Sequence, residues 1–216
     1  MALSGHDLAT IELIDMSTPL PLQFGKYYHI YSRGNNRENL FVEERNYPYF
    51  MALYAKYIGL VADTYAYCLL RNHFHFLVRI KDFGELRGLN PRQRANPDGL
   101  PSRQFSNLFN AYARALNRAY GRSGALFQRP FGRVEVVSQA HLLQLVAYIH
   151  RNPQKHGFVD DFRDWPYSSY AALMASGPTR LMRADVLAWL GGEQGFIDFH
   201  QATVNEGQIR ELAPED

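Results

Sequence analysis

Alternating apolar and polar positions predict four β-strands in this chain, and longer runs with a helical period predict three helices between them. Apolar residues recur at every second position of a half-buried strand and at a period near 3.6 along an amphipathic helix. The expected strands cover residues 26–33, 62–70, 74–80 and 133–137, and the expected helices cover 46–58, 102–120 and 139–151. The predicted order of elements is therefore β-α-β-β-α-β-α.

This order is that of a ferredoxin-like fold, an α+β architecture built on an antiparallel four-stranded sheet. We expect the helices to pack on one face of the sheet, which leaves the other face open unless another segment covers it. The same plan carries many unrelated activities, so function has to be argued from individual residues.

The ends of the chain fall outside this pattern, which predicts a main domain at residues 26–177. Residues 1–25 contain Pro19, Pro21 and Gly25 and show no clear period, and we expect a mobile N-terminal arm there. Residues 178–216 predict a small C-terminal helical extension, with one amphipathic helix before Gly191 and a short one after Gly192. We expect this extension to cover the sheet or to pair two chains.

Composition and the absence of long apolar runs indicate the cellular compartment of the protein. Of the 216 residues 46% are hydrophobic, which is ample for a folded core, and the single cysteine, Cys68, excludes an internal disulfide. No apolar run reaches transmembrane length, and residues 1–16 lack the basic start of a signal peptide. We therefore expect a cytoplasmic protein that does not contact a membrane.

The net charge is only +2, but the basic residues are concentrated in one segment. Between residues 79 and 133, eleven basic residues stand against three acidic ones, and ten of the eleven are arginine. Such asymmetry favours a surface for a polyanion, and arginine suits phosphate groups and base faces better than lysine does. The alternative is an ordinary solvated helix face together with a flexible basic loop at residues 90–101.

One short motif, His73-Phe74-His75, lies at the start of the third predicted strand. Side chains two apart on a strand point to the same face, so the two imidazoles lie side by side while Phe74 turns towards the core. Two imidazoles suit a divalent metal, although they complete only half of its ligand set. The competing interpretation is two polar residues on a half-exposed strand.

The third predicted helix could complete such a site. Tyr148 and Asn152 are four positions apart and therefore share a helix face. Because Asn152 precedes Pro153, we expect the helix to end there. An amide oxygen is a suitable ligand for Mg²⁺ or Mn²⁺, and a tyrosine beside the metal could attack phosphate as a nucleophile. With fourteen tyrosines in the chain, spacing alone does not select Tyr148 over a core aromatic residue.

Five segments occur in a characteristic order between Tyr27 and Tyr170. They are YYHIYSRGNNRENLF, AYCLLRNHFHFLV, FQRPFGRVEV, VAYIHRNPQKHGFV and DWPYSSY. Together they resemble the REP-associated tyrosine transposases, which belong to the wider group of single-tyrosine HUH transposases. The ferredoxin-like sheet of that family agrees with the predicted order of strands.

The resemblance implies specific roles. Tyr148 matches the family's nucleophile, while His73, His75 and Asn152 match the residues that hold a Mg²⁺ or Mn²⁺ ion. Members of the family cleave single-stranded DNA near small hairpins, leave a 5′-phosphotyrosine and a free 3′-hydroxyl, and rejoin the strand by reversal. The expected partner is therefore single-stranded DNA with a hairpin, bound by a monomer or a homodimer.

Binding of a single strand combines phosphate contacts with stacking of bases on aromatic rings. The expected DNA-binding residues are Arg87, Arg92, Arg94, Arg103, Arg129, Arg133 and His156 for phosphate, and Phe127 and Phe131 for stacking. His29 on the first strand could approach the metal, although a strand histidine is more often simply packed.

Three functions remain open from the sequence. The first is DNA strand transfer through Tyr148. The second is a metal-dependent phosphodiesterase in which water is the nucleophile at His73 and His75. The third is a non-catalytic module that binds single-stranded nucleic acid. Loss of a covalent DNA adduct in Tyr148→Phe separates the first function from the other two.

Overall fold

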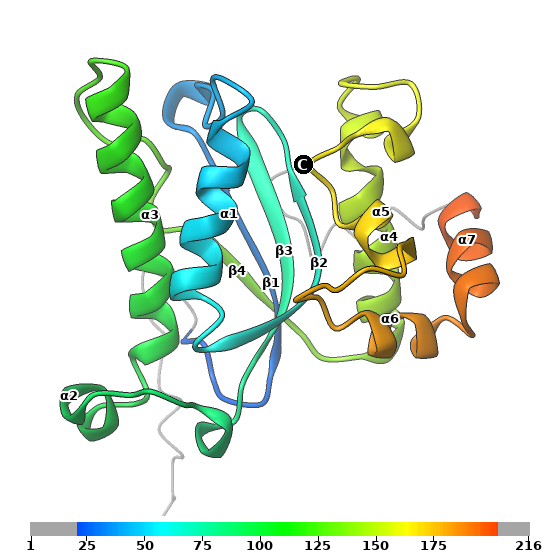
Figure 1. Ribbon diagram of the computed structural model, residues 1–216, viewed down its shortest axis with the longest axis horizontal. Helices are drawn as coiled ribbons and strands as arrows, with labels where there is room; N and C mark the ends of the chain where they lie inside the picture. Colours follow the sequence, from blue (N-terminus) through cyan, green and yellow to red (C-terminus); the bar gives the residue numbers. More distant parts are fainter. Residues whose placement is uncertain (1–20, 203–216) are drawn as a thin grey trace, which may run out of the picture.

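The computed structural model describes residues 21–202, and Figure 1 shows helices on both sides of a central sheet. The strands of that region are β1 Tyr27–Arg33, β2 Ala62–Leu69, β3 His73–Ile80 and β4 Gly132–Val136. Its α-helices are α1 Asn46–Tyr57, α2 Pro91–Ala95, α3 Leu100–Ala119, α4 Gln139–Lys155, α5 Tyr170–Met174, α6 Arg183–Trp189 and α7 Glu193–Gln201. Short 3₁₀ helices lie at Asn35–Arg37, Phe83–Glu85 and Phe162–Asp164.

The four strands form one antiparallel sheet in the order β2-β3-β1-β4, so the predicted ferredoxin-like α+β fold is confirmed. In the register of this sheet, Tyr31 of β1 lies opposite His75 on one side and opposite Gly132 on the other. Arg33 lies opposite His73. The two central strands thus place the histidines beside the aromatic and basic residues of β1.

One face of the sheet packs against α1 and α3, as the alternation predicts. Phe74 and Phe76 of β3 are buried in this core beside Phe50 of α1 and Phe105 of α3. Their burial removes a large apolar area from water, and this is the main stabilisation of that layer.

The other face is covered as well, so the expectation that helices lie on one face only is wrong. Helix α4 packs on β2 and β3, and a second core there joins Leu77 and Cys68 to Val146 and Ile149 of α4. The physical reason is the composition of β2, which is apolar on both faces and therefore needs cover on both. This second layer places α4 directly over the histidine face of β3.

Helix α4 also continues further than expected. It runs through Asn152 and Pro153 to Lys155, and both of these residues are buried. The predicted end at Asn152 is wrong because the restriction before proline is a preference, which packing and the hydrogen bond from His156 N to Asn152 O (3.0 Å) outweigh. Tyr148, Asn152 and His156 therefore follow one another on successive turns.

The described parts of the N-terminal arm and the C-terminal extension pack against the sheet. Leu22 is buried and the Gly25 amide donates to Ile80 O at 2.9 Å, so the expected mobile arm is wrong for residues 21–25. Residues 1–20 of that arm lie outside the described part of the chain. In the C-terminal extension, α6 and α7 pack in the second core, and Thr64 bridges to Leu181. The extension therefore covers the sheet, one of its two expected roles, while residues 203–216 are not described.

The segment at residues 90–101 contains a short helix where the sequence predicted only a loop. Asn90 caps α2 by accepting from the Gln93 amide, and Pro91 occupies its first turn, where proline is tolerated. Ser138 caps α4 as expected, accepting from the His141 amide. Within residues 21–202, no helix is both long enough and apolar enough to span a bilayer.

Candidate active site

The two histidines of the motif lie where the strand pattern predicts, on the β3 face covered by α4. His73 and His75 are both buried, and their rings lie 5.1 Å apart between centroids. The ring planes are nearly perpendicular, at 88°. The alternation of β3 thus brings the pair together while Phe74 points into the opposite core.

Neighbouring side chains orient both imidazoles. Nδ1 of His73 lies 2.7 Å from the amide oxygen of Asn72, which can only accept, so Nδ1 carries the proton and Nε2 carries a lone pair. Nδ1 of His75 lies 3.0 Å from Nε2 of His29 on β1. Metal-binding histidines are typically oriented in this way, through the ring nitrogen that does not bind the metal.

Helix α4 brings Tyr148 and Asn152 to the same place. The Tyr148 ring lies edge-on to His75 with centroids 5.7 Å apart, and edge-on to His29 at 6.3 Å. Asn152 Nδ2 donates to Tyr148 O at 3.1 Å, which turns its amide oxygen the other way. Tyr148, Asn152 and the histidine pair are therefore brought together by the packing of α4 on β3.

Two polar atoms of this cluster are buried without a hydrogen-bond partner among the described residues. They are Nε2 of His73 and Oδ1 of Asn152. Buried polar atoms are nearly always satisfied, so such a pair indicates a place that a ligand fills. An imidazole nitrogen and an amide oxygen are both suitable ligands for Mg²⁺ or Mn²⁺.

Burial keeps the histidines neutral. Together with smaller contributions from the nearby His156 and Arg33, and partly opposed by the Asn152 side chain, it lowers the pKa of His73 to about 3. Burial likewise holds the pKa of His75 well below its usual value, with smaller contributions from His73 and His29. Neutral imidazoles keep the lone pairs that a metal requires.

The donor set fits a divalent cation only with additional ligands. Within residues 21–202 no group of three or more His, Cys, Asp or Glu side chains is arranged to hold a metal. His73, His75 and Asn152 would supply two nitrogens and one oxygen, and water or a bound phosphate would have to complete the shell. Such an open shell is common where a metal binds its substrate directly.

Basic side chains lie beside this cluster. The His156 ring at the end of α4 lies 4.8 Å from His73, and Lys155 Nζ lies 5.2 Å from the Tyr148 ring centroid. Arg33 lies opposite His73 in the sheet. His156 was expected to contact phosphate and lies beside His73, and its phosphate contact stays a prediction. Sequence reasoning did not select Arg33, Asn72 or Lys155. Asn72 and Lys155 are close in sequence to the motif residues, and this closeness could have identified them.

The predicted arginines divide into two groups. Arg129 and Arg133 lie beside β1 and β4, and Arg133 lines a cavity shared with His73. Arg87, Arg92 and Arg94 lie around α2, beyond the end of β3 that is distant from His73 (Figure 1). Arg103 at the start of α3 bonds to Asn96 O near that same end, and the neighbouring Ser102 Oγ accepts from Arg133 at 3.0 Å, so the two groups meet at the start of α3. Because β3 has eight residues and strands rise by roughly 3.3 Å per residue, the two ends lie roughly 25 Å apart.

The two phenylalanines expected to stack on bases are mostly core residues. Phe127 packs against Phe109 with ring centroids 5.1 Å apart and is only 6% exposed. Phe131 packs against Phe105 and lies under the Arg133 guanidinium, whose carbon is 3.8 Å from the ring centroid. Phe131 does line the cavity beside the histidines, whereas Phe127 does not.

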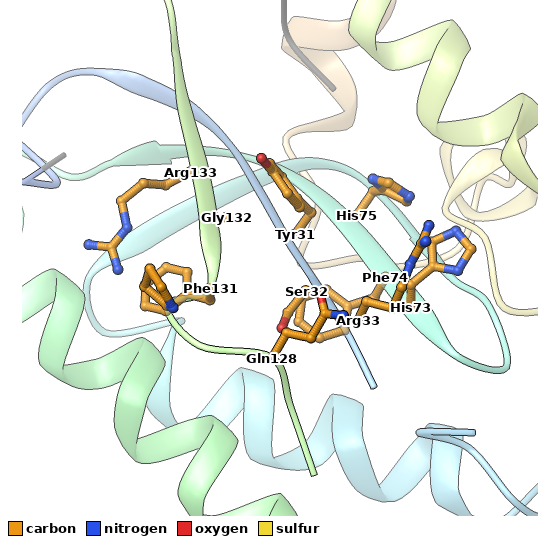
Figure 2. A pocket seen from close by; sticks show the side chains of 11 residues that line it. Tyr31, Ser32, Arg33, His73, Phe74, His75, Gln128, Phe131, Gly132 and Arg133 are labelled. Carbon is orange, nitrogen blue, oxygen red and sulfur yellow. The ribbon is translucent and has the colours of Figure 1, made fainter. Parts of the chain in front are cut away.

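That cavity adjoins the metal-binding candidates and has a volume of about 340 Å³. Figure 2 shows its lining residues, which come from β1, β3, β4 and the segment before β4. They include Ser32, Arg33, Gln128 and Arg133 together with His73 and His75.

Comparison with known proteins gives related results in sequence and in fold. No protein-family model matches the chain. A Haemophilus influenzae protein named as a REP-associated tyrosine transposase is 30% identical over 110 residues, which make up 50% of this chain. The matched region spans 58% of that relative's length.

A solved structure described as a REP-associated tyrosine transposase bound to a REP hairpin matches with a TM-score of 0.58. The match covers 82% of this chain and 96% of the solved chain at 18% identity, which shows a shared fold. The sequence match and the structural match point to the same family. The predicted resemblance of this chain to the REP-associated tyrosine transposases is therefore confirmed.

Proposed function

We propose that this protein cleaves and rejoins single-stranded DNA at hairpin sequences of the REP type, using Tyr148 as the nucleophile. The observation that carries this proposal is the edge-on contact of the Tyr148 ring with His75, 5.7 Å between centroids. The unpartnered atoms of His73 and Asn152 are buried within the same cluster. A nucleophile, two imidazoles and an amide oxygen are thus held at one place by rigid elements.

The proposed partner follows from the relatives. The solved neighbour is described as bound to a REP hairpin, and the sequence relative is named as a REP-associated transposase. Arg33 lies opposite His73 in the sheet, and Lys155 Nζ lies 5.2 Å from the Tyr148 ring centroid. Such groups attract and orient the phosphates of a DNA strand.

The chemistry is a transesterification. The Tyr148 hydroxyl oxygen attacks the scissile phosphorus and forms a phosphotyrosine bond to the 5′ end of one fragment. The bond between phosphorus and the 3′ oxygen breaks, and that oxygen takes a proton and leaves as a free 3′-hydroxyl. The phenol loses its proton to solvent. Attack by a 3′-hydroxyl on the phosphotyrosine reverses these steps and rejoins a strand, so no nucleotide cofactor is consumed.

The residues around Tyr148 prepare this step. His73, His75 and Asn152 would hold a Mg²⁺ or Mn²⁺ ion, whose charge polarises the phosphate when it is bound. Asn72 fixes the tautomer of His73, and His29 bonds to Nδ1 of His75, the ring nitrogen that would not bind the metal. Lys155, near the Tyr148 ring, adds a positive charge beside the candidate nucleophile.

The test is adduct formation on a denaturing gel. Wild-type protein, Tyr148→Phe and the control Tyr49→Phe are incubated with Mn²⁺ and a panel of labelled hairpin oligonucleotides from the source genome. Tyr49 is an exposed tyrosine of α1, so its substitution controls for loss of a hydroxyl elsewhere. We expect a covalent protein–DNA band with wild type and Tyr49→Phe that does not form when EDTA is added before the DNA, and no band with Tyr148→Phe.

Two other results would replace the proposal. Release of cleaved DNA by Tyr148→Phe at a near-normal rate would assign the site to a phosphodiesterase that uses water. Binding of the hairpins without cleavage by any of the three proteins would assign the fold to a nucleic-acid-binding module.

A further inference from the structure

The pairing of β1 with β4 and with the segment before β4 is interrupted beside the candidate active site. Tyr31 pairs with Gly132, and three residues further along β1, Gly34 bridges to Phe127. Three steps on β1 therefore correspond to five on the other segment, and the register shifts by two residues. The extra residues turn away from β1, as residues in a bulge do, and leave a notch beside Ser32.

This notch forms part of the cavity of about 340 Å³ next to His73 and His75. Its size falls in the range of roughly 300–1,000 Å³ that is typical of small-molecule sites. Figure 2 shows Ser32, Gln128 and Phe131 among the residues around the cavity. His73 and His75 also line it, and Arg33, where β1 ends, pairs with His73, so the cavity adjoins the proposed cleavage site.

The lining combines flat apolar surface with hydrogen-bonding groups. Oγ of Ser32 is buried and has no hydrogen-bond partner among the described residues, although the side chain lines an open cavity. Gln128 is exposed and carries an amide that can both donate and accept. Arg133 stacks on Phe131 at 3.8 Å, which adds a planar, positively charged group. A buried hydroxyl without a partner indicates a bond that a ligand supplies.

We propose that this cavity receives one nucleobase, turned out of the DNA strand, from a nucleotide that flanks the scissile phosphate. This inference rests on the proposed function and names the part of the substrate that the site reads. A nucleobase has flat faces for the apolar lining and a polar edge for the Ser32 hydroxyl and the Gln128 amide. Because the cavity joins the histidine pair, the base and the reacting phosphate belong to neighbouring positions of one strand.

An abasic scan tests the proposal. A hairpin oligonucleotide that forms the Tyr148 adduct is prepared with a single abasic nucleotide at each position around the cleavage point. We expect one flanking position at which removal of the base lowers the rate of adduct formation tenfold or more. Uniform tolerance of abasic nucleotides, with normal adduct formation, would overturn the base pocket and leave the proposed function standing.

Substitution of Ser32 assigns the effect to this cavity. Ser32→Ala removes a hydroxyl that has no partner in the free protein, so the melting temperature should stay the same or rise. We expect the rate on the preferred base to fall about tenfold, the usual effect of losing one good hydrogen bond, and the preference among bases to weaken. The control Ser106→Ala removes an exposed hydroxyl that bonds within α3 and should leave the preference unchanged. An unaltered base preference in Ser32→Ala would refute the role of this hydroxyl.

A binding measurement makes the inference independent of cleavage. Tyr148→Phe is mixed with the same hairpins carrying 2-aminopurine at one position each. We expect a change in fluorescence at a single position, reduced in the double variants with Ser32→Ala or Gln128→Ala. Hairpins that bind with no position-specific change would overturn the pocket whether or not the wild type forms an adduct. A wild type that forms no adduct and binds no hairpin would remove the proposed function and the inference together.

Discussion

The ring of Tyr148 on α4 lies edge-on against the ring of His75 on β3, with centroids 5.7 Å apart and planes at 82°. This contact joins two residues that lie 73 positions apart in the sequence. It exists because α4 covers the face of the sheet on which the histidine pair lies. The first three predictions concern residues near this contact, and the fourth concerns α7.

The first prediction concerns His29. Its Nε2 lies 3.0 Å from Nδ1 of His75, so it positions an imidazole that would bind the metal. Replacing His29 with leucine should weaken Mn²⁺ binding about 10–100-fold, the usual effect of losing such an orienting partner. Isothermal titration calorimetry measures this without turnover. His29→Asn, which keeps a hydrogen-bonding group, should recover part of the loss, and His141→Gln, a histidine at the start of α4, should bind like wild type. Equal Mn²⁺ affinity in His29→Leu would show that His29 is only packed.

The second prediction concerns stabilisation by metal. A ligand that binds only the folded state at a hundred times its dissociation constant stabilises the fold by about 2.7 kcal/mol. For a chain of this size, that shift corresponds to a rise in melting temperature of about 5–10 °C. We expect this rise when Mn²⁺ is added to wild type, and its loss in His73→Ala and Asn152→Ala. Differential scanning fluorimetry with and without EDTA measures it. A Mn²⁺-induced rise of the same size in Asn152→Ala would remove that side chain from the ligand set.

The third prediction concerns Gly132, where β4 begins opposite Tyr31. A Cβ added at Gly132 would lie only 2.0 Å from the Tyr31 ring, so the ring would have to move. The ring centroid of Tyr31 lies 4.9 Å from that of His29 and 6.5 Å from that of His75. Displacement of Tyr31 would therefore disturb both histidine rings. Gly132→Ala should therefore lower the free energy of unfolding by about 1–3 kcal/mol, as overpacking does.

Urea denaturation measures this cost. Gly177→Ala is the matched control, since its added Cβ would meet nothing within 4 Å. Identical midpoints for Gly132→Ala and wild type would mean that Tyr31 moves without cost.

The fourth prediction concerns the pH dependence of α7. His200 on α7 accepts from His150 of α4 (2.7 Å) and donates its other ring N–H to Phe196 O at 2.8 Å. Burial lowers the pKa of His200 to about 4, partly opposed by the Phe196 carbonyl and helped by Arg151. Because the folded state disfavours the proton, this contribution to stability is present above pH 6.5 and is lost as the pH falls towards 4.

Hydrogen–deuterium exchange follows this locally. Corrected for intrinsic rates, amides of α7 should exchange faster at pH 5 than at pH 7.5, while those of α3 should change little. Equal protection of α7 at both pH values would contradict a network that holds only neutral histidines.

The sequence by itself determined the elements and much of the candidate site. The period of two in β3 places His73 and His75 on one face, and the period near 3.6 in α4 places Tyr148 one turn before Asn152. These relationships are local, since each is set by the geometry of a single element. The order of strands likewise followed from the order of apolar patterns along the chain.

Tertiary structure decided what no local pattern contains. The strand register sets His29 against His75 and Arg33 against His73, and packing of the apolar face of β2 brings α4 over the histidines. Packing also carried α4 past Asn152, against the local preference before proline. The shift of two residues beside Ser32 depends on how two distant segments meet. Such contacts join residues far apart in sequence, and their geometry is fixed only when the whole core is packed, because many registers satisfy the same alternation.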